Sequence, residues 1–172
     1  MKDNSRQNFY TQFRILGIYQ FVGGIIGLLI LFYSIYNSGI HVIPVFFLLI
    51  IFFLFFAYSI ICGLLCLRSH DLALPLSKIN QVLQLIGIGI GGYSYSYVAG
   101  VNLSLKLNFP DLSSFNFALG ISKMEMRFNT NSEFSMLEIN LVALALMIWI
   151  DRFQRKITNE QLKATTEQIG SS

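Results

Sequence analysis

The sequence predicts a membrane protein of mainly α structure: a bundle of four transmembrane helices with a small extracytoplasmic antiparallel β element, of two or three strands, between helices 3 and 4. Two observations predict this class. Only 12% of the 172 residues are charged and 54% are hydrophobic, whereas about a quarter of a soluble domain is charged. The hydrophobic residues are also gathered in runs of the roughly 20 residues that a bilayer core requires. The chain is therefore expected to form a single membrane domain.

The expected elements follow one another along the chain. Transmembrane helices are expected at residues 15–36, 44–67, 79–100 and 134–152, the β element at 101–129, and a cytoplasmic tail at 153–172. This order places nine Lys and Arg residues on the side of the N-terminus and three on the other side. The positive-inside rule then predicts that both termini are cytoplasmic, in a plasma membrane or a bacterial inner membrane. Without a span at 79–100 the distribution would be less favourable.

The first run, 15–36, has small and polar residues on one face of the expected helix. Gly17, Gln20, Gly23, Gly24 and Gly27 fall within one sector at 3.6 residues per turn. Gly23 and Gly27 have the GxxxG spacing that lets two helices approach closely. We expect Gln20 to form a hydrogen bond between helices, with solute binding as the alternative.

The second run, 44–67, is the most hydrophobic part of the chain, and Pro44 suits the first turn of its helix. Cys62, Cys66 and His70 would share a face if that helix continued, and such ligands can bind zinc. Buried cysteine is ordinarily a small apolar residue, and a fourth ligand is missing unless Asp71 serves. No metal, cofactor or disulfide is therefore predicted.

The third run, 79–100, is polar for a membrane helix. Small or polar residues lie on two opposite faces: Asn80, Gln84, Gly87, Gly91 and Ser94 on one, and Gly89, Gly92, Ser96 and Gly100 on the other. A helix with two small faces is expected between two neighbours, so this segment is predicted to be the central helix of the bundle. Accordingly, replacing Gly91 or Gly92 with Leu is expected to destabilise the bundle more than replacing Gly120.

After Gly100 the periodicity changes to two, which is typical of a strand with one buried face. Apolar residues alternate with polar ones from Val101 to Phe109, and alternation resumes at Phe115. The alternation changes frame across Gly120 to Lys123, which predicts a bulge or a turn there. A lone hairpin is marginally stable in water, so its apolar face is expected to rest on the bilayer, the helix ends or another chain.

The last run begins with Ser135 and Glu138, which have the spacing of a capping box. A carboxylate within a membrane helix is a candidate functional group. The position of Glu138 near the outer end favours capping, with ion or proton handling as the alternative. Gln20, Asn80, Gln84 and Glu138 are the candidate polar intramembrane residues. The expected helix-packing residues are Gly23, Gly24, Gly27, Gly87, Gly91, Gly92, Ser96 and Gly100.

The sequence contains no phosphate-binding loop, nucleophile elbow, HExxH motif or paired CxxC, so an enzyme is not expected. Basic residues are dispersed near the ends of apolar runs, which argues against nucleic-acid binding. The expected partners are the lipid bilayer and a protein partner or a second copy. We therefore expect an interaction or scaffold subunit of a membrane complex. The alternatives are a transporter or channel subunit that uses Gln20, Gln84 and Glu138, and a lipid-acting membrane enzyme.

Overall fold

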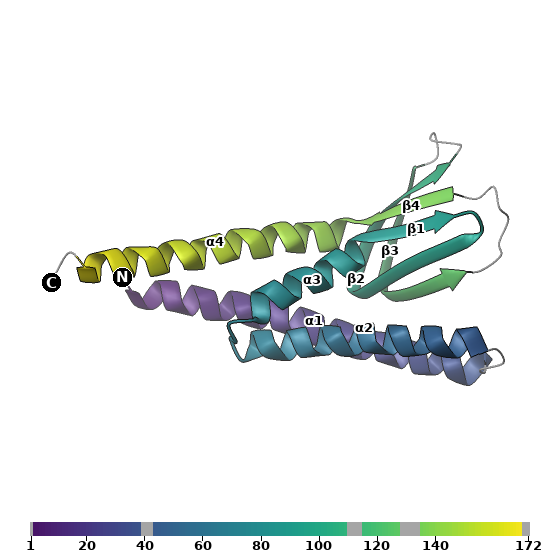
Figure 1. The fold of residues 1–172 in the computed structure, drawn as a ribbon, viewed down its shortest axis with the longest axis horizontal. Coiled ribbons are helices and arrows are strands. Elements are labelled where there is room, and N and C mark those ends of the chain that lie inside the picture. Colours follow the sequence, from purple (N-terminus) through teal and green to yellow (C-terminus); the bar gives the residue numbers. More distant parts are fainter. Residues whose placement is uncertain (1, 39–42, 110–114, 128–134, 170–172) are drawn as a thin grey trace.

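The computed structural model describes residues 2–38, 43–109, 115–127 and 135–169, which form four helices and one four-stranded sheet (Figure 1). In chain order the elements are α1 (Lys2–Ser38), α2 (Ile43–Leu67), α3 (Ala73–Leu85), β1 (Ile86–Ile90), β2 (Tyr93–Phe109), β3 (Phe115–Arg127), β4 (Ser135–Asn140) and α4 (Leu141–Ile169). The prediction of a four-span bundle is wrong. Within the described residues only two helical stretches, Phe9–Asn37 and Phe46–Leu67, are long and apolar enough to cross a membrane.

Helices α1 and α2 form an antiparallel pair in which glycines allow close approach. A Cβ atom on Gly17 would lie 2.9 Å from the carbonyl oxygen of Gly63 in α2. A Cβ on Gly24 would lie 2.9 Å from the carbonyl oxygen of Phe56. Gly23, by contrast, faces the sheet, where its Cβ would lie 2.7 Å from the Cα of Gly100. The glycine sector of α1 is therefore filled by elements of the same chain.

The segment 79–100 is not a transmembrane helix. Helix α3 ends at Leu85, and β1 and β2 form a hairpin that turns at Gly91 and Gly92. Both glycines have positive φ, +59° and +85°, as a two-residue type I′ turn requires. The segment leaves the helix because Ile86, Ile88 and Ile90 alternate with glycines. This is the period of two of a strand, and glycine is a poor helix former.

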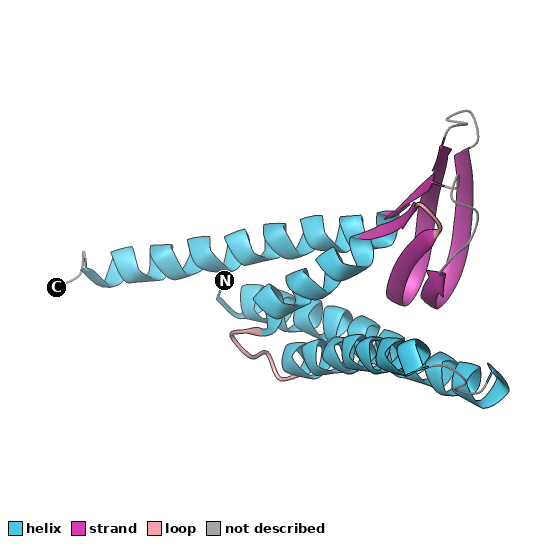
Figure 2. Cartoon of the chain, turned by 45° about the vertical axis from the view of Figure 1, so that its right-hand side comes forward, coloured by secondary structure: helices cyan, strands magenta, loops and turns pink. Residues whose placement is uncertain are grey.

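The sheet has the order β1-β4-β2-β3, and β1 also pairs with β2. Strands β1, β4 and β2 therefore pair with one another in a closed circuit, whereas β3 pairs with β2 alone among the described strands. The β2–β3 register shifts between Val98 and Val101, opposite Lys123 and Ile121. This bulge corresponds to the frame change predicted across Gly120 to Lys123. Beyond it, both views show the β2–β3 hairpin projecting sideways from α1 and α2 (Figures 1 and 2).

The fourth expected span begins as a strand. Residues 135–140 form β4, which pairs with β1 and β2, and helix α4 starts only at Leu141. The predicted capping box of Ser135 and Glu138 is thus absent. Asn140 caps α4 instead, because its Oδ1 accepts hydrogen bonds from the backbone N–H groups of Val142 and Ala143 at 3.1 and 3.3 Å.

Two apolar clusters hold these elements together. One joins α1, α3 and α4 through Leu16, Leu74, Ile150 and Phe153, all buried. The other joins α1 and α2 to β2 through Leu31, Phe52, Phe56 and Tyr97. The described ends of α1 and α4 that lie nearest the two chain termini are at the left in Figure 1, and the α2–α3 connection lies further in, on the same side of the sheet. The sheet packs against the middle of α1 and α2, where Gly100 lies against Gly23 and Tyr97 bonds to Phe55.

Candidate functional site

The sheet carries its polar residues inside and its apolar residues outside. Directly paired residues of antiparallel strands share a face; Ser104 pairs with Asn140, and Lys106 with Glu138. Ser104, Glu138 and Asn140 are at most 3% exposed. The opposite face pairs Leu105 with Ile139 and with Phe117. In a hairpin that exposes its polar face to water, the polar side chains would be outside. Here they are inside.

The outer face has two parts with different surroundings. Near the hairpin turn, Tyr95 and Tyr97 pack on α2: the Tyr95 ring stacks on Phe52, and the Tyr97 hydroxyl donates to the Phe55 carbonyl at 2.8 Å. Past the bulge no described element covers the face. There Phe115, Phe117, Leu119 and Ile121 are 60–80% exposed. We call these four residues and Val101, which is also exposed, the apolar row.

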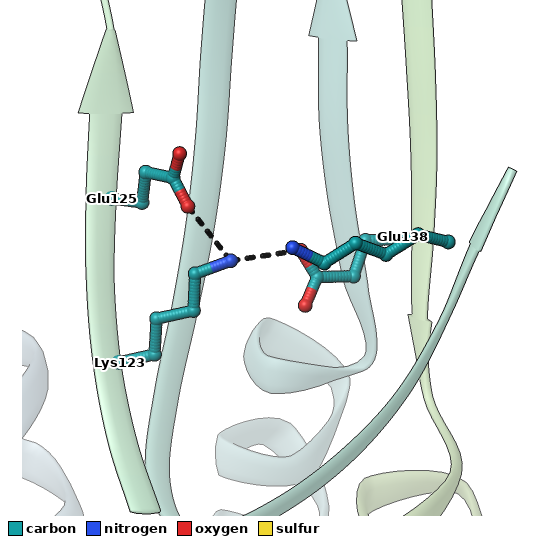
Figure 3. A network of polar contacts seen from close by, with 4 residues as sticks. Lys123, Glu125 and Glu138 are labelled. Atoms are coloured by element: carbon teal, nitrogen blue, oxygen red, sulfur yellow. Dashed lines mark hydrogen bonds and ion pairs between the residues drawn. The ribbon is translucent and has the colours of Figure 1, made fainter. Parts of the chain in front are cut away.

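Glu138 is the centre of an ion-pair network on the inner face. Its Oε2 lies 3.0 Å from the Lys123 ammonium and 3.8 Å from that of Lys106. Lys123 in turn lies 2.8 Å from Oε2 of Glu125, so it bridges two carboxylates (Figure 3). Three strands supply these charges, and the Glu138 side chain is only 3% exposed. The network therefore fixes the mutual position of β2, β3 and β4.

The network sets the protonation of its own members. Burial acts to raise the pKa of Glu138, but the nearby Ser104 hydroxyl and the positive charges of Lys123 and Lys106 outweigh it, so the pKa of Glu138 is lowered. Burial likewise acts to lower the pKa of Lys123, but Glu125 and Glu138 outweigh it, so that pKa is raised. Both groups consequently stay charged at neutral pH despite their burial.

A second polar cluster joins the helices. Gln20 Oε1 accepts a hydrogen bond from the Ser77 hydroxyl at 3.0 Å, and the Ser59 hydroxyl donates to the backbone carbonyl of Gln20 at 3.1 Å. Asn80 donates to the same Ser59 hydroxyl at 3.1 Å. Gln84 reaches the sheet, where its Oε1 accepts from the Ala99 N–H at 2.9 Å. Helices α1, α2 and α3 are thus joined by buried hydrogen bonds.

The candidate polar residues therefore fall into two groups. Gln20 and Asn80 share Ser59 as a partner, and Gln84 extends α3 toward β2. Glu138 belongs to the sheet, where its ion pairs in the described chain are with lysines of β2 and β3. The four residues therefore do not form one site.

Several buried polar residues were not singled out from the sequence. Gln81 is fully buried, and neither atom of its side-chain amide has a hydrogen-bond partner among the described residues. Other buried atoms in the same situation are Gln20 Nε2, Asn80 Oδ1, Gln84 Nε2, Ser94 Oγ, Asn102 Oδ1, Ser104 Oγ, Glu138 Oε1 and Asn140 Nδ2. For Asn102 and Ser104, the alternation at 101–109 was the available signal, but the expectation drawn from it concerned only the apolar face.

The possible zinc ligands do not form a metal site. Cys62 and Cys66 are free and fully buried in α2, and Cys66 lies 3.3 Å from the Ser77 hydroxyl. His70 lies beyond the end of α2, where its Nδ1 accepts from the N–H of Leu72. Among the described residues, no three His, Cys, Asp or Glu side chains are grouped to hold a metal ion.

Comparison with known proteins found no matching family model, no matching curated protein and no matching solved structure.

Proposed function

We propose that this protein is an interaction subunit of a membrane complex, anchored by α1 and α2, which joins another polypeptide through the edge of β3. The anchoring part rests on two helices with apolar stretches of 29 and 22 residues, each sufficient for a bilayer core. A soluble core helix or a signal sequence also meets this criterion. However, only 39% and 28% of these stretches are buried within the chain, so most of their apolar surface is left for lipid.

The observation that carries the interaction is the edge of β3. Among the described strands, β3 pairs with β2 only, which leaves its other backbone edge available along the exposed residues 115–121. An edge strand without charge or proline is a template for another strand. Residues 115–121, Phe-Asn-Phe-Ala-Leu-Gly-Ile, contain neither. A strand added there would gain main-chain hydrogen bonds, as in β-augmentation.

Gly120 provides a matched test of this edge. A Cβ at Gly120 would meet no atom within 4 Å, so side chains are tolerated there, and lysine discourages edge pairing. With a photo-crosslinking residue at Asn116, we expect an adduct with another polypeptide in native membranes. Gly120→Lys should abolish this adduct and Gly120→Ala should preserve it.

The control for crosslinking is the same photo-reactive residue at Leu162 of α4. Both Leu162 and Asn116 are exposed positions. Equal adducts at Asn116 and Leu162, or an adduct that survives Gly120→Lys, would count against pairing through β3. Absence of any adduct at Asn116 would contradict the proposed function.

The unpartnered polar atoms favour a second candidate, a subunit that conducts a polar solute or an ion. Buried polar groups in proteins almost always have partners, and a row of them beside membrane helices is a feature of solute pathways. If this is the function, Gln84→Leu and Glu138→Gln should abolish a solute flux in proteoliposomes while the complex still assembles. Loss of assembly without a specific loss of flux would exclude it.

A further inference from the structure

We propose that the apolar row of the sheet is embedded among lipid acyl chains, so that part of the sheet lies within the bilayer beside α1. This inference rests on the proposed anchoring of α1 and α2, but not on the pairing of β3 with another polypeptide. It assigns the face of the sheet to lipid and leaves the edge of β3 to protein.

The depth of the sheet follows from its contacts with α1. Ser122, which directly follows the apolar row in β3, donates a hydrogen bond to the carbonyl of Gly23 at 3.1 Å. Gly23 is the middle residue of the apolar stretch Phe9–Asn37. On the neighbouring strand, the carbonyl of Val101 accepts from the Tyr19 hydroxyl at 3.1 Å. If α1 crosses the membrane, this end of the apolar row is near the bilayer centre.

Contacts with α2 give the same depth independently. The hydroxyl of Tyr97 bonds the Phe55 carbonyl, and the Tyr97 ring packs on Phe55 and Phe56 at 5.1 Å. Phe55 and Phe56 lie near the middle of the stretch Phe46–Leu67. The sheet is therefore held against the central part of both helices and not at their ends.

The apolar row continues a face that is already packed on these helices. Tyr95 and Tyr97 occupy the same outer face of β2 as Val101, on the other side of the bulge. Helix α1, which contacts β2 and β3 at Gly23, also exposes the apolar side chains Ile18, Val22, Ile25 and Leu29. Exposed apolar patches of such extent mark a protein or membrane contact.

The direction of the hairpin keeps much of the row at this depth. Ile121 and Phe115 are about 20 Å apart along β3, at roughly 3.3 Å per residue. Both views show this part of β2 and β3 leaving α1 and α2 sideways (Figures 1 and 2). The hydrocarbon region extends only about 15 Å from the bilayer centre, so a sideways course is what keeps such a strand within it.

The inner face explains how charged residues are accommodated there. Lipid offers no hydrogen bonds, so polar groups at that depth must face one another. Lys106, Lys123, Glu125 and Glu138 do so, because all point to the inner face and form ion pairs. Apolar side chains outside and paired polar side chains inside are the polarity that a lipid-exposed sheet requires.

The test is the environment of an NBD label on single cysteines, in the full chain reconstituted in phosphatidylcholine vesicles. The native Cys62 and Cys66 are fully buried, and the unsubstituted chain measures their background labelling. At Leu119→Cys we expect blue-shifted emission and quenching by nitroxides on the acyl chains. The quenching should be severalfold stronger than at Leu162→Cys on α4.

Leu29→Cys, at an exposed position of α1, tests the anchoring of α1 and α2 separately from the embedding of the sheet. Acyl-chain quenching at Leu29 with water-like emission at Leu119 would overturn the embedded sheet and leave the anchoring intact. Water-like emission at both would overturn the anchoring as well. A label at Leu119 shielded from both acyl-chain nitroxides and aqueous iodide would mean that protein covers the row, which also overturns the inference.

Discussion

Glu138 joins three strands through two lysines, and it does so from a nearly fully buried position. A buried ion pair stabilises a protein only while both partners remain, because removal of one leaves an uncompensated charge. Lys123 holds the nearer partner position at 3.0 Å and also contacts Glu125. At the residue scale the stability of the sheet therefore depends on the ionisation of this pair.

The lowered pKa of Glu138 predicts acid sensitivity. A folded-state pKa below the ordinary value of 4.5 means that the ion pair stabilises the fold above pH 4.5. This contribution is lost as the pH falls through the folded-state pKa. We expect Glu138→Gln to flatten the pH dependence of the free energy of unfolding below pH 4.5, measured by urea titration in detergent. If the free energy of unfolding of Glu138→Gln fell with pH below 4.5 as steeply as that of the unsubstituted protein, the proposed stabilisation by ionised Glu138 would be contradicted.

The same pair predicts the cost of losing a lysine. Lys123→Met should destabilise the sheet by up to about 3 kcal/mol, the lower end of the range for breaking a buried pair, because Lys123 is 25% exposed and Lys106 stays near Glu138. The double variant Lys123→Met with Glu138→Gln is the control and should recover part of the loss, because the buried carboxylate of Glu138 is no longer left without its nearer partner. Equal destabilisation in the single and double variants would argue against the pair.

Glycine positions differ in the side chains that they can tolerate. We expect Gly23→Ala to cost about 1–3 kcal/mol, as overpacking does, because its Cβ would overlap the backbone of Gly100. Gly120→Ala meets nothing and should change stability by less than about 0.5 kcal/mol. Thermal unfolding in one detergent compares the two. A similar loss in both variants would contradict the packing of α1 on the sheet.

At the scale of elements, the strand-to-helix junction at Asn140 sets where α4 begins. The Asn140 side chain satisfies two backbone N–H groups that the first turn of a helix leaves without partners. Loss of such a cap costs about 1 kcal/mol. Asn140→Ala is therefore expected to destabilise α4 by about this amount, and Asn140→Asp should retain most of the cap. Hydrogen exchange of the Val142 and Ala143 amides reports the effect locally, and unchanged protection in Asn140→Ala would contradict the cap.

Sequence patterns predicted the elements in which one periodicity, helical or extended, continues along the whole run. The apolar runs of α1 and α2 and the alternation of β2 correspond to helices and a strand in the structure. The prediction failed where a helix and a strand share one run, at Leu85 to Ile86 and at Asn140 to Leu141. In both places hydropathy is continuous, so a 20-residue window includes the junction without detecting it. The alternation of Ile and Gly at 86–90 was the discriminating signal.

The candidate site was less predictable than the fold. The sequence marked Glu138 as noteworthy, but its partners Lys106 and Lys123 lie on other strands, and β4 was not expected at all. Which side of an alternating strand faces the interior depends on its neighbours. Here the polar side of β2 is inside because β4 and β1 close over it, an arrangement that no local pattern specifies.

At the scale of the whole molecule, the structure predicts a simple topology. The described ends of α1 and α4 nearest the chain termini and the α2–α3 connection all lie on the same side of the sheet (Figure 1). Arg14, Arg68, Arg152 and Lys156 belong to these segments. If α1 and α2 cross the membrane as proposed, the positive-inside rule predicts that this side is cytoplasmic, with only two full spans. Charge parity therefore does not require a span at 79–100.

Cysteine labelling tests this topology. An impermeant maleimide should modify Asp71→Cys and Leu162→Cys, both exposed positions, in inside-out vesicles and neither in right-side-out vesicles. Labelling of the two positions from opposite sides would show that α4 crosses the membrane separately. Leu29→Cys in α1 is the negative control, because a cysteine there should not be modified in either preparation.

The late position of β4 in the chain has a consequence for biosynthesis. Both lysines of the network and Glu125 are synthesised before Glu138, and β1 gains its second neighbour only when residues 136–139 pair with 86–89. Until then, Glu125 is the one carboxylate of the network beside the two lysines. Strand β4 adds the second carboxylate, and α4 begins directly after it at Leu141. Closure of the sheet and the start of α4 therefore both depend on the short segment that carries Glu138.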